Sequence, residues 1–237
     1  MTELLWGRRP PPSRGPKPAM TLEGIAEAAI TIADADGLDA VSMQRVAGDL
    51  SFTKMALYRY VPGKAELVAV MTDQAIGLPP EHPGLAWREA LQAWATDLFA
   101  AFEKHPWLLH STVGRRVLGP NELTWMDRGV QALAGSGLHG GEQLDSLAVV
   151  AGHVRTIAEQ SLTMPGGTTG STEEDITSAL VEVLSTEAER FPALATALQS
   201  IDGNQNQGLT FGLQRIFDGL EVLITARTSA PAGSQPA

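Results

Sequence analysis

Apolar residues recur every three or four positions along most of this 237-residue chain. The first clear run begins at Leu22 and places Ile25 and Ala29 on the same face of a helix. Thr21 stands where it can cap the first turn, and Gly37 stands where it can end the helix in the left-handed conformation. No stretch alternates apolar and polar residues between hairpin dipeptides, so the pattern predicts an all-α fold.

Helical periodicity continues almost to the C-terminus. Pro106, Pro120 and Pro192 each fit the first turn of a helix, where a missing N–H costs nothing. Glycines cluster at 135–141 and again at 165–170, as is typical of turns between helices. After two short helices near 42–60, longer helices are predicted at 64–76, 84–105, 106–115, 120–134, 141–164, 172–190, 192–200 and 206–227.

The two short helices have the spacing of a helix-turn-helix. Val46, Leu50 and Leu57 supply a small core, and Ala47 is small where two helices must cross closely. The second helix begins at Thr53 with side chains that can form hydrogen bonds. In this motif the N-terminal residues of the second helix face base edges in the major groove. The pattern therefore predicts a head that binds double-stranded DNA.

Charge is distributed unevenly along a chain whose formal net charge is −10. Residues 1–64 carry 8 basic and 7 acidic side chains, whereas the remaining residues carry 9 and 20. An acidic body with a locally basic head suits a protein that binds DNA through the head alone. No run reaches the roughly 18 apolar residues of a membrane helix, so no membrane partner is expected.

The chain contains no cysteine. This excludes disulfides, thiolate-ligated zinc and a thiol nucleophile, and it fits a cytoplasmic location. The phosphate-loop, nucleophile-elbow and His-Glu-x-x-His motifs are absent. We therefore expect no cofactor, no metal and no catalytic residues.

The segment 41–67 resembles the DNA-binding head of TetR-family repressors, most clearly in Ala-Leu-Tyr-Arg-Tyr-Val-Pro-Gly-Lys-Ala-Glu-Leu at 56–67. With the preceding helix, the resemblance covers residues 21–70. One departure is Ser51, which stands where the family usually has glycine in the turn. A left-handed serine is strained by about 1–3 kcal/mol, so either the strain is present or the turn is rebuilt.

The resemblance implies a role for nine residues in binding DNA. Lys64 opens the fourth helix, where the helix dipole and the ammonium both favour a phosphate. Met55 cannot hydrogen-bond a base and suits a thymine methyl group. Tyr60 has packing within the head as its alternative role, and Arg45 has a solvated surface position. The predicted DNA contacts are Gln44, Arg45, Thr53, Lys54, Met55, Ala56, Tyr58, Tyr60 and Lys64.

Three pieces of the later chain, 105–109, 119–123 and 211–215, resemble a tetracycline-repressor-like C-terminal domain. The resemblance implies a helical body that forms a homodimer and binds a small-molecule effector. Wide apolar stripes on the helices 141–164 and 206–227 favour a four-helix bundle between two subunits; internal core is the alternative. The predicted dimer residues are Leu144, Ala151, Leu213, Phe217 and Leu220.

Effector contacts are predicted from aromatic residues in the middle of the body and from polar residues on otherwise apolar helices. Each of these residues has an ordinary structural role as its alternative. The candidates are Trp94, Phe102, Trp107, His110, Trp125, His153 and Gln160.

The sequence thus predicts four segments: a flexible, basic, proline-rich arm at 1–18, a helix-turn-helix domain at 19–64, an effector-binding and dimerisation domain at 65–227, and a disordered tail at 228–237. The predicted function is a ligand-responsive transcriptional regulator, a repressor released from a palindromic operator by its effector. The alternatives are a helical small-molecule-binding protein or enzyme that uses the body cavity, and a dimeric DNA-binding protein without an effector.

Overall fold

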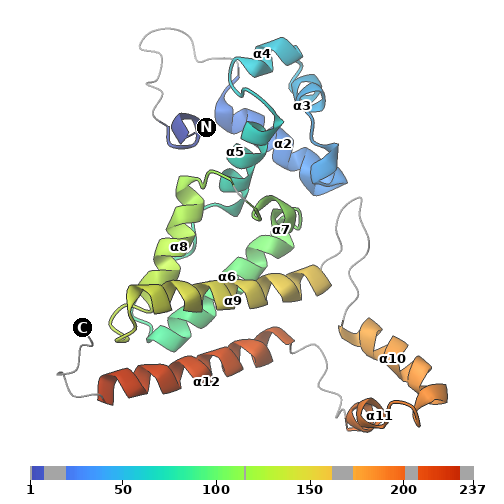
Figure 1. Ribbon diagram of the computed structural model, residues 1–237. Coiled ribbons are helices and arrows are strands. Elements are labelled where there is room, and N and C mark those ends of the chain that lie inside the picture. The colour runs from blue at the N-terminus through green and yellow to red at the C-terminus, as the bar shows by residue number, and fades with distance from the viewer. Residues whose placement is uncertain (1, 8–19, 115, 162–172, 201–207, 230–237) are drawn as a thin grey trace. The chain divides into compact units, whose positions relative to one another are not determined.

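The computed structural model describes residues 2–7, 20–114, 116–161, 173–200 and 208–229. Helices are the regular structure in these residues, and no strand occurs among them (Figure 1). The all-α prediction is confirmed. Contacts between residues divide the chain into two units, the first ending at Leu133 and the second beginning at Ala134.

Unit 1 contains the head predicted from sequence and the helices that follow it. Thr21 caps its helix by accepting a hydrogen bond from the Gly24 N–H at 3.1 Å, as the sequence predicts. Gly37 ends that helix with a φ of 83°. The elements of unit 1 are α1 (Thr2–Leu5), α2 (Leu22–Asp36), η1 (Leu38–Ala40), α3 (Met43–Asp49), α4 (Lys54–Tyr58), α5 (Lys64–Ile76), α6 (Trp87–Lys104), α7 (Leu108–Ser111) and α8 (Pro120–Ala132).

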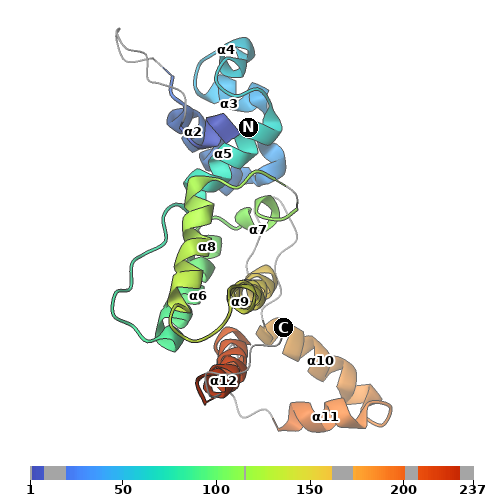
Figure 2. The same ribbon diagram turned by 60° about the vertical axis from the view of Figure 1, so that its left-hand side comes forward.

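The core of unit 1 extends from the head along α5. Helix α5 packs against α2 on one side and against α7 and α8 farther along (Figure 2). Ile25 on α2 and Leu57 on α4 are fully buried, as are Leu67 and Met71 on α5. Helices α6 and α8 also pack together. One continuous helix therefore connects the head core with the helices after it.

Two helices in unit 1 are shorter than the sequence predicts. Helix α6 begins at Trp87 rather than at 84. Gly84 has a φ of 78°, which is incompatible with a right-handed helix at that position. Helix α7 spans only Leu108–Ser111, because Pro106 lies in a preceding turn, where its carbonyl accepts from the Leu109 N–H at 3.1 Å. The predicted first-turn position is observed for Pro120 and Pro192 but not for Pro106.

The predicted arm also departs from expectation at its beginning. Residues Thr2–Leu5 form the single helical turn α1, which packs against α5. Residues 8–18 of the arm and 230–237 of the predicted tail lie outside the described residues. The extended arm therefore remains a prediction for 8–18 alone.

Unit 2 comprises α9 (Gly140–Ser161), α10 (Glu173–Glu187), α11 (Pro192–Gln199) and α12 (Gly208–Ser229). Helices α9 and α12 lie side by side, and α10 packs against α11. Val150 and Val154 on α9 are fully buried, as are Leu213 and Phe217 on α12. No helix among the described residues is long and apolar enough to cross a membrane.

Candidate nucleic-acid interface and regulatory body

Helices α3 and α4 are positioned by caps that the sequence makes visible. Ser42 accepts a hydrogen bond from the Arg45 N–H, and Thr53 accepts one from the Ala56 N–H, both at 3.2 Å. Val46 is fully buried between the helices. The two helices thus form a helix-turn-helix, and the side chains on its outer surface do not pack in the core.

The turn between α3 and α4 keeps the left-handed conformation despite Ser51. Ser51 has a φ of 59°, the only positive value for a described residue other than glycine. Its N–H donates to the Gly48 carbonyl at 2.9 Å, and the Phe52 N–H donates to the Ala47 carbonyl at 2.8 Å. These two bonds form a Schellman motif, which satisfies the carbonyls at the end of α3. The expected strain is therefore present, and the turn is not rebuilt.

Most of the predicted DNA contacts are exposed. The side chain of Met55 is 73% exposed, which is unusual for an apolar residue within a folded head. Ala56 and Tyr60 are half-buried, so Tyr60 also packs within the head. The remaining predicted contacts, all exposed, are Gln44, Arg45, Thr53, Lys54, Tyr58 and Lys64.

The cations of this surface differ in their partners. Arg45 forms an ion pair with Asp36 at the end of α2. The Lys54 ammonium lies 5.7 Å from the centre of the Tyr58 ring. Lys64 begins α5 and forms no ion pair with a described residue. Lys54 and Lys64 thus need break no ion pair with a described residue to contact a nucleic acid, whereas Arg45 must first leave Asp36.

The predicted aromatic effector contacts of unit 1 are buried within it. Trp94 and Trp125 meet edge to face with ring centres 6.1 Å apart, and the Trp94 indole N–H donates to the Trp125 carbonyl at 2.9 Å. The Trp125 indole N–H donates to the Gly77 carbonyl at 3.0 Å. Phe102 and Trp107 are 2% and 0% exposed. Each of these three indole N–H groups donates a hydrogen bond within the chain. The rings can therefore contact an effector only through their apolar surfaces.

The predicted polar effector contacts are scattered. His110, at the end of α7, is exposed in unit 1. In unit 2, His153 is half-buried and lies 3.1 Å from the Leu209 carbonyl through its Nε2 atom, while Gln160 is exposed. His153 packs so closely against Gly212 that an added Cβ there would overlap its imidazole ring. His153 thus lies at the contact between α9 and α12.

The predicted dimer residues fall into two groups. Leu213 and Phe217 are 0% and 1% exposed in the single chain, so they pack within it. Leu144 is 50% exposed, and Ala151 and Leu220 are half-buried. Leu220 lines a pocket of about 390 Å³ between α9 and α12, together with Val149, Ile216 and Leu223. The pocket is also lined by Glu142, Asp145, Ser146 and Arg215, so the open surface of this helix pair combines an apolar patch with charged side chains.

Comparison with known proteins identifies the family. Residues 79–224 match the model of the tetracycline repressor-like C-terminal domain. The chain is 40% identical over 240 residues to the HTH-type transcriptional repressor DrrR1 of Streptomyces coeruleorubidus, covering 97% of this chain and 88% of that protein. The chain belongs to the TetR family of transcriptional regulators. Both halves of the sequence resemblance, head and body, are thereby confirmed.

Solved structures of TetR-family proteins share the fold. Apo ActR of Streptomyces coelicolor superposes with a TM-score of 0.73 at 26% identity, covering 89% of this chain and 99% of that one. ActR in complex with actinorhodin gives a TM-score of 0.71 at 29% identity, covering 86% of this chain and 98% of that one. That neighbour thus holds a small molecule on a closely similar fold.

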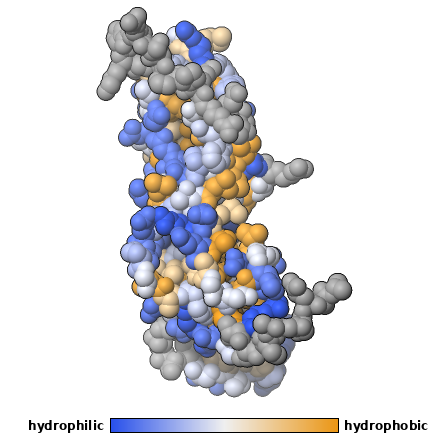
Figure 3. All heavy atoms as spheres, turned by 90° about the vertical axis from the view of Figure 1, so that its left-hand side faces the viewer, coloured by the Kyte–Doolittle hydropathy of each residue, from blue (hydrophilic) through white to orange (hydrophobic). Residues whose placement is uncertain are grey.

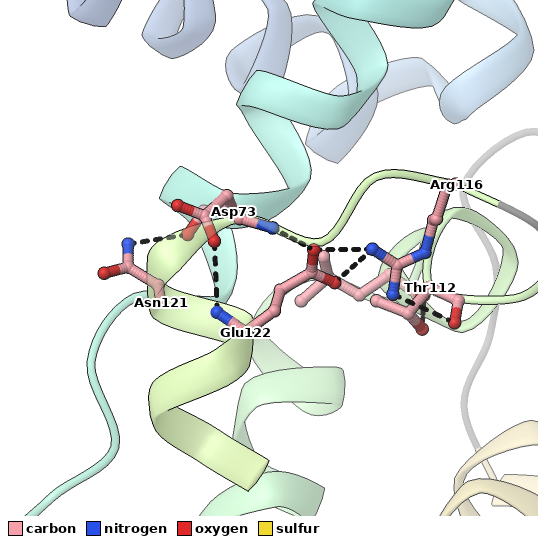
Figure 4. Close-up of polar contacts among 7 residues, drawn as sticks. Asp73, Thr112, Arg116, Asn121 and Glu122 are labelled. Atoms are coloured by element: carbon pink, nitrogen blue, oxygen red, sulfur yellow. Dashed lines mark hydrogen bonds and ion pairs between the residues drawn. The ribbon is translucent and has the colours of Figure 1, made fainter. Parts of the chain in front are cut away.

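A polar junction that the residue pattern does not predict lies between α5 and α8 of this TetR-family protein (Figure 4). Asp73 on α5 accepts a hydrogen bond from the Glu122 N–H at 3.0 Å, and the Asn121 side chain donates to the Asp73 carbonyl at 2.8 Å. The Glu122 carboxylate accepts from the Gly119 N–H at 3.2 Å and pairs with Arg116 at 2.5 Å. Helix α8 is therefore capped by a side chain from α5.

Burial sets the electrostatics of this junction. Asp73 is only 7% exposed, and this desolvation raises the pKa of its carboxyl, with the nearby Glu122 charge adding to the effect. The hydrogen bonds from the first turn of α8 act in the opposite direction. Gly119 leaves room for Asp73, because an added Cβ would lie 2.6 Å from the Asp73 Cβ.

A second junction links α2 with the turn between α6 and α7. Asp34 on α2 accepts from the Trp107 indole N–H at 2.7 Å and lies 2.8 Å from Nδ1 of His105. His105 is 7% exposed. The sequence signal available for both junctions is a polar residue on a buried helical face, but the partner lies about fifty to seventy residues away along the chain. Periodicity alone does not identify such partners.

Proposed function

We propose that this TetR-family protein is a ligand-responsive transcriptional repressor that binds a palindromic operator as a homodimer. The observation that carries the proposal is the α3–α4 head, which presents Thr53, Lys54 and Met55 outward from a closed core. A helix-turn-helix dimer contacts two half-sites about 34–36 Å apart, or a multiple of that distance. DNA binding through this head also implies action in the cytoplasm.

Within the head, Lys64 and Lys54 have different roles. Lys64 stands at the start of α5, where it and the helix dipole favour a phosphate. Lys54 is the first residue of α4, the second helix of the motif. The N-terminal residues of this helix are the ones that face base edges. Phosphate contacts set affinity and its salt dependence, whereas base contacts set sequence preference.

The test starts from a palindrome selected by this protein from a pool of random DNA duplexes. Lys64→Ala should weaken binding to all sequences alike and reduce the salt slope by about 0.9, the value for one phosphate contact. Lys54→Ala should instead relax the preference at particular base pairs. Lys104→Ala, an exposed lysine at the end of α6, is the matched control and should bind like wild type. Unchanged binding by both head variants would contradict this interface.

Dimerisation is assigned to the open surface of α9 and α12. Leu144, Val149 and Val222 are each at least half-exposed, and Leu220 lines the pocket beside them. Leu213 and Phe217 support the surface from beneath, because they already pack within the chain. Four such helices from two subunits would bury these apolar side chains.

Effector binding is assigned to the helical body. The neighbour ActR is solved with actinorhodin, so actinorhodin is the first candidate to test as an effector. An effector can release DNA only if it binds the DNA-incompetent state more tightly. A hundredfold loss of operator affinity corresponds to a coupling of about 2.7 kcal/mol.

The junctions in unit 1 offer a route for this coupling. Helix α5 starts in the head and ends at the Asp73–Glu122 contact with α8, while Asp34 connects α2 with Trp107. A shift of α7 or α8 would therefore move helices of the head. By reciprocity, saturating operator must weaken effector binding by the same factor, which titration calorimetry can measure. Equal effector affinities for free and DNA-bound protein would exclude the mechanism.

We infer a regulator rather than an enzyme. The similar proteins are described as a transcriptional repressor and a transcriptional regulator, which supports this inference. Turnover of a bound compound by the purified protein would contradict this inference.

A further inference from the structure

A pocket of about 330 Å³ lies in unit 1 beside the junction between α5 and α8. Its walls come from the first turn of the chain, from α2, from α5 and from α8. It is separate from the predicted effector residues, none of which lines it. The lining residues are Leu4, Leu5, Gly7, Leu22, Glu23, Val70, Asp73, Gln74 and Asn121.

The walls divide by chemistry. Leu4, Leu5, Leu22 and Val70 supply an apolar surface on which a hydrocarbon can pack. Among the described residues, the polar side chains of the lining are two acids and two amides, and none is basic. The pocket therefore combines an apolar surface with negative charge.

Hydrogen bonding leaves mainly acceptors in the pocket. The Asn121 amide donates to the Asp73 carbonyl at 2.8 Å, and the Gln74 amide donates to the Glu23 carbonyl at 3.4 Å. The side-chain oxygens of both amides accept no hydrogen bond from a described residue. These oxygens and the carboxylates can accept hydrogen bonds from a ligand that donates them.

Asp73 gives the pocket its anchor. The residue is only 7% exposed, and its carboxylate accepts a hydrogen bond from the Glu122 N–H. The carboxylate forms no ion pair with a described residue, because Arg116 pairs with Glu122 instead. A buried carboxylate without a counter-ion is costly, and its burial raises its pKa. A bound cation would remove this cost.

We propose that this pocket is a second ligand site, which binds an amphipathic organic amine with its ammonium group on Asp73 and its apolar part against Leu22 and Val70. The site does not depend on the proposed effector site in the body. It is formed by residues of a head helix, of the linking helix α5 and of α8.

The experiment uses the full chain with 2-phenylethylamine and its neutral analogue 2-phenylethanol, measured by titration calorimetry. The amine should bind saturably, and the alcohol should bind at least about tenfold more weakly, as expected for the loss of one charge-assisted hydrogen bond in a buried site. Asp73→Asn should reduce amine affinity by at least about tenfold, because its amide oxygen still accepts from Glu122 but carries no charge.

Asp97→Asn is the matched control, since it removes a partly buried carboxylate that pairs with His82 away from the pocket. It should leave amine affinity unchanged. If Asp73→Asn does not fold, Gln74→Met removes a pocket acceptor and should weaken the amine severalfold.

Three outcomes overturn the proposal. They are equal binding of amine and alcohol, unchanged amine affinity of the folded pocket variant, and no saturable amine binding below about 10 mM. An amine that binds only in the body would give the second outcome. Loss of effector response with amine binding intact would overturn the proposed function and leave this site standing.

Discussion

The α3–α4 head and the α9–α12 pair are both made of two packed helices, but they leave opposite surfaces to solvent. The head buries Val46 and Leu57, and its exposed surface is mostly polar, with Met55 and Tyr58 as exposed large hydrophobic side chains among the described residues. The α9–α12 pair buries Phe217 yet leaves side chains such as Val149 and Val222 more than half-exposed. Hydrophobic residues also reach the surface among hydrophilic ones on the face shown in Figure 3.

This difference separates two kinds of binding surface. A head that contacts DNA needs polar and basic groups, because phosphates and base edges are polar. A helix pair that contacts a second copy needs apolar surface, because burial of that surface drives association. Substitutions that exchange the two surface types should therefore have the largest effects.

The strongest test of the comparison is Leu220→Glu on α12. Leu220 lies beside Ile216 and Leu223 in the pocket of the helix pair, so a dimer there would bury one added carboxylate per subunit at about 3–5 kcal/mol each if it finds no partner. We expect monomers by light scattering and a parallel loss of operator binding. Leu78→Glu, at a position 70% exposed in the loop after α5, is the control and should remain dimeric. A wild-type-like dimer from Leu220→Glu would refute the interface.

Alanine substitutions at two glycines compare how readily a helix contact in each unit accommodates an added methyl group. Gly119→Ala would push a Cβ into Asp73 close to the backbone of α5, which we expect to cost about 1–3 kcal/mol in unfolding free energy. Gly212→Ala meets the imidazole of His153, which can rotate away, and the alanine also favours the helix. Its net cost should stay below about 1 kcal/mol.

Urea unfolding measures both glycine variants. Gly48→Ala, where an added Cβ meets nothing within 4 Å, is the control for the effect of a methyl group itself. An equal cost for Gly119→Ala and Gly212→Ala would show that the α5–α8 junction yields as easily as the α9–α12 contact.

The head could be predicted in detail because its signals are local. Thr21, Ser42 and Thr53 cap helices through N–H groups three residues away, and Ser51 turns the chain through bonds within one motif. These interactions follow from residue type and spacing. The amino-acid sequence alone is therefore enough to predict the Thr21 cap, the start of the second helix at Thr53 and the position of the turn.

The rest depends on partners that spacing does not identify. The apolar stripe of α12 is visible in the sequence, but periodicity does not divide it between Phe217, which the chain itself buries, and Val222, which it leaves exposed. The sequence predicts that Trp107 lines an effector cavity, yet its indole donates to Asp34, 73 residues away along the chain. Such roles follow from tertiary packing.

Asp73 provides a pH test that separates the junction from exposed acids. Its raised pKa means that the folded state holds this proton at pH values where the unfolded chain has lost it. Its contribution to stability therefore grows as the pH falls from neutrality through the folded pKa toward 3.8. Asp73→Asn should lack this gain and be slightly more stable than wild type at neutral pH.

The comparison acid is Glu142 in unit 2, whose pKa is lowered by hydrogen bonds from the His139 N–H and from Arg227. Its contribution is present above the unfolded value of 4.5 and is lost as the pH falls through the folded pKa. Glu142→Gln should therefore remove a contribution to stability that decreases as the pH falls, whereas Asp73→Asn removes one that increases. Urea unfolding of wild type and of each variant between about pH 7.5 and about pH 4 measures how the difference in unfolding free energy changes with pH. A change in the same direction for the contributions of both acids would contradict the assignment.

The smallest expected effect is at Ser51 in the turn of the head. Its φ of 59° costs a residue with a Cβ about 1–2 kcal/mol, which Ser51→Gly removes. The glycine also gains freedom in the unfolded chain, which offsets about 0.5–1 kcal/mol. A net stabilisation of about 0.5–1 kcal/mol should remain, measurable by urea unfolding. Ser51→Ala keeps the strain and should show no gain.

Operator affinity should be unchanged in both variants, because the Schellman bonds of Ser51 and Phe52 use the backbone alone. A change in DNA affinity without a change in stability would mean that the serine hydroxyl itself takes part in the interface.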